Sequence, residues 1–265
     1  MMTEYTTETK GGKMGLTAHQ QRDILLGGCQ DEVGKYPTMA RLNRQWPFAV
    51  FLMLMCYVAR GDVMAAQGEY ISLPPATLVT DGQPLERLLQ QRRSIRTFGK
   101  APLSLAELGQ LLWAAQGISH PQGLRTAPSA GALYPLELYV VAGEVEGLPS
   151  AVYRYLPEKH RLLETATGDQ RQALAGAALD QSWLSDAAVV VVFTAIYART
   201  TRKYGERGIR YVHMEVGHAA QNLFLQAEAQ ALVSVVVGAF RDDRVSKVLD
   251  LPADTQPLLL MPVGR

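Results

Sequence analysis

Short apolar runs of strand length recur from residue 136 to the C-terminus, and no other feature limits the possible fold as strongly. They cover residues 136–142, 151–155, 187–197, 233–237 and 258–263. Runs this rich in valine and leucine favour β-strands. Their near-continuous apolar character further indicates a sheet that is covered on both faces.

Amphipathic stretches alternate with these runs and predict helices at residues 85–91, 104–116, 170–179, 208–231 and 242–249. Ser104 is suited to the N-cap of the second helix, because Glu107 stands three residues later in a capping box. Strands and helices that alternate in this way, without an internal repeat or long linker, predict one α+β domain over residues 80–265.

The long helix predicted at 208–231 contains many small residues around its circumference, among them Ala219, Ala220 and Ala227. Such a helix can pack closely on several neighbours. It is either a core helix of the monomer or a helix at a subunit interface, and the sequence leaves both alternatives open.

Composition excludes several classes of function. The 265 residues include 26 Lys and Arg against 25 Asp and Glu, a formal net charge of +1, so we expect no nucleic-acid or anionic membrane partner. Cys29 and Cys56 both precede the predicted domain. Disulfides, zinc–cysteine sites and iron–sulfur clusters are therefore excluded beyond residue 66. His213 and His218 would lie about 140° apart on a helix, too far around it to share a metal.

The N-terminal part divides into two segments. Residues 1–38 are polar and lack periodicity, which predicts a disordered extension, and a start at Met39 would leave them untranslated. Residues 39–66 are typical of a secretory signal peptide: arginines precede an apolar run, and small residues follow it. The run is shorter than the roughly 20 residues that span a bilayer. We expect an exported, periplasmic protein; an uncleaved helix or a buried segment would instead make it membrane-associated or cytoplasmic.

Two short motifs suggest a cofactor site. The first offers three guanidiniums and two hydroxyls, and the second a backbone with small side chains: Arg92-Arg93-Ser94-Ile95-Arg96-Thr97-Phe98 and Pro128-Ser129-Ala130-Gly131-Ala132-Leu133-Tyr134-Pro135. Guanidiniums donate paired, charge-assisted hydrogen bonds to phosphate, and a backbone with small side chains can approach a flat ring. The alternatives are a solvated basic turn and an ordinary loop; together the motifs favour a phosphorylated, planar cofactor.

Taken in order, these motifs and three others resemble the nitroreductase superfamily, most closely its SagB-type dehydrogenase branch of thiazoline and oxazoline oxidases. The others are Glu215 to Leu223, Val237-Gly238-Ala239-Phe240 and Pro262-Val263-Gly264-Arg265. The resemblance implies an FMN-dependent homodimer of α+β fold. Its central sheet would be mostly antiparallel and flanked by helices, with the long helix at the subunit interface.

The resemblance also implies roles for particular residues. The basic motif would contact the FMN phosphate, ribityl chain and pyrimidine edge, the second motif would line the ring from the partner subunit, and a further pair would face its reactive edge. Arg265 would help to hold the phosphate. The residues concerned are Arg92, Arg93, Ser94 and Arg96, then Pro128, Ser129, Ala130 and Gly131, then Gly238 and Ala239. Lys203 and Tyr204 match the branch's acid/base pair; the alternative is a solvated lysine and a packed tyrosine.

We therefore expect an FMN-dependent oxidoreductase that works in two half-reactions. A donor such as NAD(P)H would reduce the flavin, which would pass electrons to a small acceptor such as a quinone or nitroaromatic, or the enzyme would oxidise a substrate. One alternative is an azoline dehydrogenase acting on a modified peptide through Lys203 and Tyr204. An alternative from another class is a flavin-binding protein without catalytic activity. No metal site is expected.

Overall fold

The computed structural model describes residues 68–78 and 82–265. The predicted extension at 1–38 and the predicted signal peptide at 39–66 lie outside this part of the chain. Within it, no helix combines the length and apolar character needed to cross a membrane.

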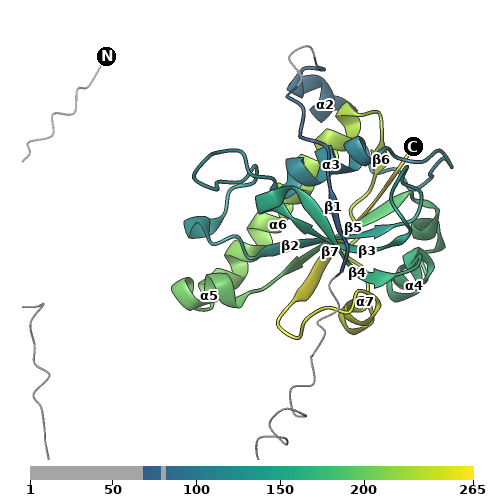
Figure 1. The fold of residues 1–265 in the computed structure, drawn as a ribbon. Helices are drawn as coiled ribbons and strands as arrows, with labels where there is room; N and C mark the ends of the chain where they lie inside the picture. Colours follow the sequence, from purple (N-terminus) through teal and green to yellow (C-terminus); the bar gives the residue numbers. More distant parts are fainter. Residues whose placement is uncertain (1–67, 79–81) are drawn as a thin grey trace, which may run out of the picture. The chain divides into compact units, whose positions relative to one another are not determined.

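The centre of the domain is a seven-stranded sheet in the order β1-β4-β3-β2-β5-β7-β6 (Figure 1). All neighbouring strands are antiparallel. The strands are β1 (Tyr70–Ser72), β2 (Leu136–Ala142), β3 (Ala151–Leu156), β4 (Arg161–Thr167), β5 (Val189–Ala195), β6 (Val233–Ser234) and β7 (Gln256–Gly264).

Helices pack on both faces of this sheet. The α-helices are α2 (Leu85–Gln91), α3 (Leu105–Gln116), α4 (Arg171–Ala177), α5 (Ala198–Tyr204), α6 (Arg207–Ala229) and α7 (Asp242–Val248). Short 3-10 helices are η1 (Ala130–Ala132), η2 (Pro157–Lys159) and η3 (Ser182–Asp186). Helices α3 and α6 cover one face, and α4, η3 and α7 cover the other. The predicted α+β class with a flanked antiparallel sheet is thus confirmed.

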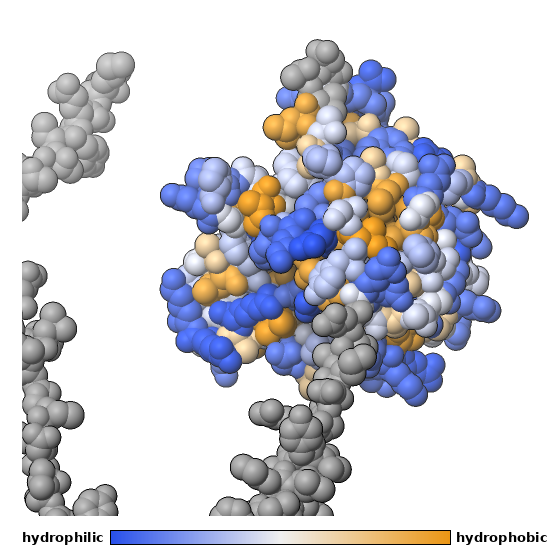
Figure 2. Space-filling model, in the orientation of Figure 1, coloured by the Kyte–Doolittle hydropathy of each residue, from blue (hydrophilic) through white to orange (hydrophobic). Residues whose placement is uncertain are grey.

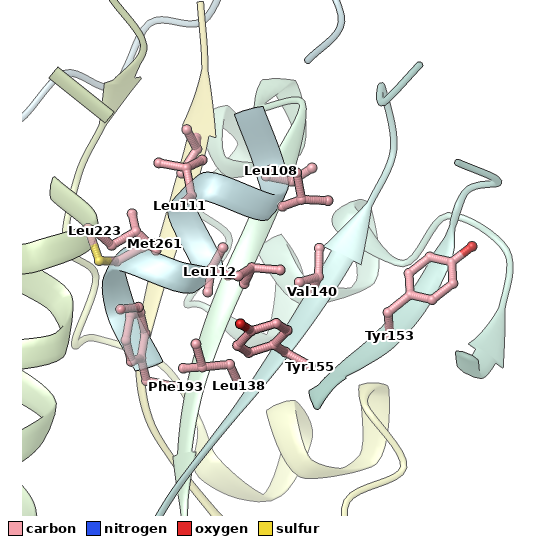
Figure 3. Close-up of a cluster of buried hydrophobic side chains, with 14 of the residues drawn as sticks. Leu108, Leu111, Leu112, Leu138, Val140, Tyr153, Tyr155, Phe193, Leu223 and Met261 are labelled. Atoms are coloured by element: carbon pink, nitrogen blue, oxygen red, sulfur yellow. The ribbon is translucent and has the colours of Figure 1, made fainter. Parts of the chain in front are cut away.

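The side chains of β5 show why the apolar runs are continuous. Val191 and Phe193 belong to the core under α3 and α6, whereas Val190 and Val192 belong to the core under α4 and α7. Figure 3 shows part of the first core, where leucines of α3 meet side chains of the sheet such as Phe193. Because successive strand residues point to opposite faces, a strand buried on both sides needs apolar residues at every position.

The prediction was wrong in a few elements. The strand expected at 233–237 is paired with β7 only over Val233–Ser234, and Val237 forms an isolated bridge with Leu260. Strands β1 and β4 and helix α5 were not predicted. Their half-exposed, polar-rich sequences lack the continuous apolar character of the central strands.

The predicted capping box at the start of α3 is present. The Ser104 hydroxyl accepts a hydrogen bond from the Glu107 backbone N–H at 3.2 Å, and the Ser104 N–H donates to the Glu107 carboxylate at 2.8 Å. We expect Ser104→Ala to lower the free energy of unfolding by about 1 kcal/mol, because an N-terminal donor of the helix loses its acceptor. Urea unfolding measures this change, and Ser182→Ala, at an exposed serine, is the control. If both variants had the same free energy of unfolding, Ser104 would not act as a stabilising N-cap.

Candidate functional site

The predicted binding residues fall into two groups according to the elements that they border. The first, which we name the arginine edge, comprises residues 92–96, residues 238–239 and Arg265, which lie beside β6 and β7. Its first segment runs beside β6: Ser94 forms a bridge with Ser234, and the Ile95 N–H donates to the Ser234 carbonyl at 2.9 Å. The Gly99 N–H donates to the carbonyl of Arg265 at 2.5 Å. The basic motif therefore lies along the edge of the sheet where the chain ends (Figure 1).

The three guanidiniums of the basic motif carry uncompensated charge. Arg92 lies over the Phe224 ring at 4.7 Å, and Arg96 lies over the Trp183 ring at 5.8 Å. Arg93 donates to the carbonyls at the end of α2. Within residues 68–78 and 82–265, none of the three pairs with a carboxylate. Such a set fits a phosphate, which would supply the missing negative charge.

Arg265 lies at the same edge but already has a carboxylate partner. Its Nη2 contacts the two Glu107 carboxylate oxygens at 2.8 and 2.9 Å. Burial alone would raise the pKa of Glu107, but hydrogen bonds from Ser104 and Arg265 hold it below its usual range. A phosphate that used Arg265 would therefore have to compete with Glu107 for the same guanidinium.

Gly238 and Ala239 are exposed in the loop that follows β6. The loop is fixed where the Val237 N–H donates to the Leu260 carbonyl at 2.8 Å and Gln181 donates to the Ala239 carbonyl at 3.0 Å. No atom outside its neighbours lies within 4 Å of a Cβ built on Gly238. The backbone here is anchored and open on one side, as contact with a flat ring requires.

The second cluster, the glycine turn, comprises residues 128–132. Gly131 has a φ of +63°, and the Tyr134 N–H closes the turn by donating to the Ser129 hydroxyl at 2.9 Å. A Cβ built on Gly131 would lie 2.8 Å from the Tyr204 hydroxyl and 3.0 Å from the Lys203 Nζ. The structure thus brings the predicted acid/base pair against the predicted ring-binding turn, and it leaves no room for a side chain between them.

Lys203 and Tyr204 end helix α5, just before the long helix α6. The Lys203 Nζ lies 5.4 Å from the centroid of the Tyr204 ring, which meets the Tyr211 ring edge-on at 5.2 Å. Tyr204 is therefore held by packing, and the lysine side chain is exposed beside it. An amine and a phenol side by side can hold and move a proton.

Glu215 begins one of the motifs that carry the family resemblance, but no role was predicted for it. It is 3% exposed on α6 and lines a cavity of about 290 Å³ with residues of the glycine turn. Burial raises the pKa of its carboxyl to about 7, while the Ser129 hydroxyl and the Arg125 guanidinium lower it. Its Oε1 has no hydrogen-bond partner. The sequence signal that could have pointed to Glu215 is a glutamate among small apolar residues of a long predicted helix.

We expect Glu215 to make stability depend on pH. A carboxyl whose pKa is raised by folding destabilises the folded state as pH rises from about 4.5 to about 7, by on the order of 3 kcal/mol. In urea unfolding, Glu215→Gln should gain stability relative to the wild type as the pH rises from 5 to 8. Glu206→Gln, an exposed glutamate, is the control. If the free energies of unfolding of the wild type and of Glu215→Gln changed with pH in parallel, the raised pKa of Glu215 would be contradicted.

The two clusters are separate within one chain. The arginine edge meets α6 where Arg92 lies over Phe224, and the glycine turn meets it where Ser129 faces Glu215. Nine residues of helix separate these contacts, or about 14 Å along its axis. The groups predicted to bind a phosphate and those predicted to bind a ring thus meet the same helix in two places.

Comparison with known proteins identifies the family. The nitroreductase family model matches residues 89–265. A nitroreductase-like protein of Methanocaldococcus jannaschii is 48% identical over 181 residues, 68% of this chain and 90% of that protein. A nitroreductase-like structure from Ralstonia eutropha has a TM-score of 0.66 at 30% identity and covers 76% of this chain and 90% of its own. The microcin B17-processing protein McbC of Escherichia coli is 30% identical over 62% of this chain and 63% of McbC. The chain therefore belongs to the nitroreductase family, whose members are flavoprotein oxidoreductases.

Proposed function

We propose that this protein is an FMN-dependent oxidoreductase that acts as a homodimer. The FMN would lie between the arginine edge of one protomer and the glycine turn of its partner. The supporting observation is the separation of the two clusters along α6 of one chain. In a dimer, the glycine turn of one protomer can lie against the arginine edge of the other. The proposal also rests on the family.

Exposed apolar side chains beside both clusters support the dimer. Ile95 and Val236 are 37% and 41% exposed near the arginine edge, and Met214 is 52% exposed beside the glycine turn. Figure 2 shows that apolar groups interrupt a largely hydrophilic surface on the face in view. Apolar surface around a polar site is typical of a subunit interface.

The residues of the two clusters would have different roles toward the cofactor and the substrate. The guanidiniums of Arg92 and Arg96 would bind the phosphate, with the backbone at Gly238 and the glycine turn against the ring. Bound FMN would supply two-electron chemistry, with NAD(P)H as one candidate donor. Lys203 and Tyr204 would hold or release a proton where the turn meets the substrate.

A second candidate is the dehydrogenation of a modified peptide. It is favoured by the position of Lys203 and Tyr204 against Gly131, and by the relative named as a microcin B17-processing protein. A substrate oxidised in this way loses a hydride and a proton, and an amine beside the ring site is placed to accept the proton. Reduction of a quinone or nitroaromatic makes no such demand on one lysine.

The first experiment is the visible absorption spectrum of the purified protein, with mass identification of the small molecule released on denaturation and sedimentation analysis of the assembly. Released FMN from a dimer is expected. A colourless protein that takes up no added FMN would overturn the proposal. Bound FMN without turnover by any donor and acceptor would instead indicate a flavin-binding protein without catalytic activity.

Export through residues 39–66 remains a separate prediction, tested by comparing the amounts of the protein in periplasmic and cytoplasmic fractions.

A further inference from the structure

A second cavity, of about 420 Å³, lies where strands β2 and β3 diverge. Strand β2 pairs with β5 along its whole length, Leu136–Ala142, but pairs with β3 only over Tyr139–Val141. The first residues of β2 and the last residues of β3 therefore stand apart, and both line the cavity. We name it the β2–β3 cavity.

Three guanidiniums and two carboxylates line the β2–β3 cavity. Arg199 pairs with Glu137 at 2.5 Å, and Arg125 pairs with Glu158 at 3.2 Å. Arg154 has no carboxylate partner in the part of the chain that the structure describes. The lining therefore has one positive charge in excess. The Glu158 side chain is 64% exposed, so water weakens its pair with Arg125 as well.

The lining also contains buried donors without acceptors. Gln116 is 1% exposed, and its amide nitrogen has no partner. The Nε atoms of Arg125 and Arg154 are likewise buried and unpartnered. Buried donors usually have a partner, because an unsatisfied one costs free energy. The wall of the cavity thus has one positive charge more than its carboxylates balance, and buried donors that find no acceptor. A carboxylate ligand would supply both the negative charge and the acceptors.

The β2–β3 cavity adjoins the predicted reaction site. Arg199 precedes Lys203 by four residues on α5, so the two side chains are neighbours on one face of that helix. Tyr134, whose ring lies under the Arg125 guanidinium at 4.6 Å, follows Gly131 by three residues. A ligand in the cavity would therefore be held one helical turn from the acid/base pair.

We propose that the β2–β3 cavity binds a carboxylate of the substrate, with Arg154 as its ionic partner. This inference rests on the proposed function, since it makes the cavity a specificity site for that reaction. The substrate class it implies is a small organic acid, or a peptide with a free carboxylate near the reacting bond. A neutral quinone or nitroaromatic would leave the excess charge unmatched.

The test is calorimetric titration of the full-length protein, at constant ionic strength, with N-acetylglycine and N-acetylglycinamide. The two probes have nearly the same shape and differ in charge. We expect the acid to bind at least tenfold more tightly than the amide. Arg154→Gln should reduce the affinity for the acid to that for the amide, and Arg154→Lys should keep part of the difference. Arg244→Gln, at an exposed arginine on α7, should change neither affinity.

Equal binding of acid and amide, no binding of either, or an acid affinity unchanged in Arg154→Gln would each overturn the inference. If Arg154→Gln fails to fold, the comparison of the two probes on the wild type and on Arg154→Lys still decides it. Flavin content is measured on the same samples. A protein that contains flavin but binds the acid and the amide equally would reject only the carboxylate site. A protein that prefers the acid but contains no flavin would reject only the proposed function.

Discussion

Replacing Arg92 and Arg96 together with glutamine is expected to leave the purified protein without flavin. Neither guanidinium pairs with a carboxylate in the described residues, so both can donate charge-assisted hydrogen bonds to a phosphate. Such bonds contribute about 1.5–3 kcal/mol each, and losing two should weaken FMN binding by about 100-fold or more. The measurement is the dissociation constant of added FMN, followed by quenching of flavin fluorescence.

Arg87→Gln is the matched control, because Arg87 is an exposed arginine on α2 outside the motif. It should bind FMN as the wild type does. Thermal unfolding of the double variant without flavin shows whether the fold survives, since Arg92 also packs on Phe224. A folded double variant that keeps its affinity for FMN would remove the arginine edge from the proposed site.

Lys203→Ala is expected to separate the two candidate activities. If the protein dehydrogenates its substrate, loss of the amine that lies against the glycine turn should lower that rate by about 100-fold to 10,000-fold, the usual contribution of a general acid or base. Flavin content and reduction of a quinone by the same variant should stay near the wild-type values. Steady-state rates of both reactions on one preparation give the comparison.

Arg202→Ala is the control for Lys203→Ala, because it removes a neighbouring exposed charge from the same helix. It should affect both reactions little. Equal loss of both activities in Lys203→Ala would show that the lysine supports the flavin site as a whole. Unchanged dehydrogenation would make Lys203 a solvated surface residue and would remove the amine from the proposed mechanism.

Residues whose neighbours in the sequence decide their structure were predicted well. Helix α2 and strand β2 have the predicted bounds, and the Ser104 capping box is present, because helix caps and apolar periodicity act over a few residues. The family was likewise identified from short motifs, and the family model confirms it. Strand β6 was predicted too long, because apolar character alone does not determine how far a strand finds a partner.

The sequence by itself determined the class of fold and the family, and it predicted which residues would form a site for a phosphorylated, planar cofactor. The tertiary structure alone decided which of those residues meet: Lys203 with Gly131, Glu215 with Ser129, and Arg265 with Glu107. It also placed Arg154 in a cavity without a counter-charge. The physical reason is that periodicity and capping act between near neighbours, whereas burial and charge pairing depend on contacts between residues far apart in the chain, which only the packed fold defines.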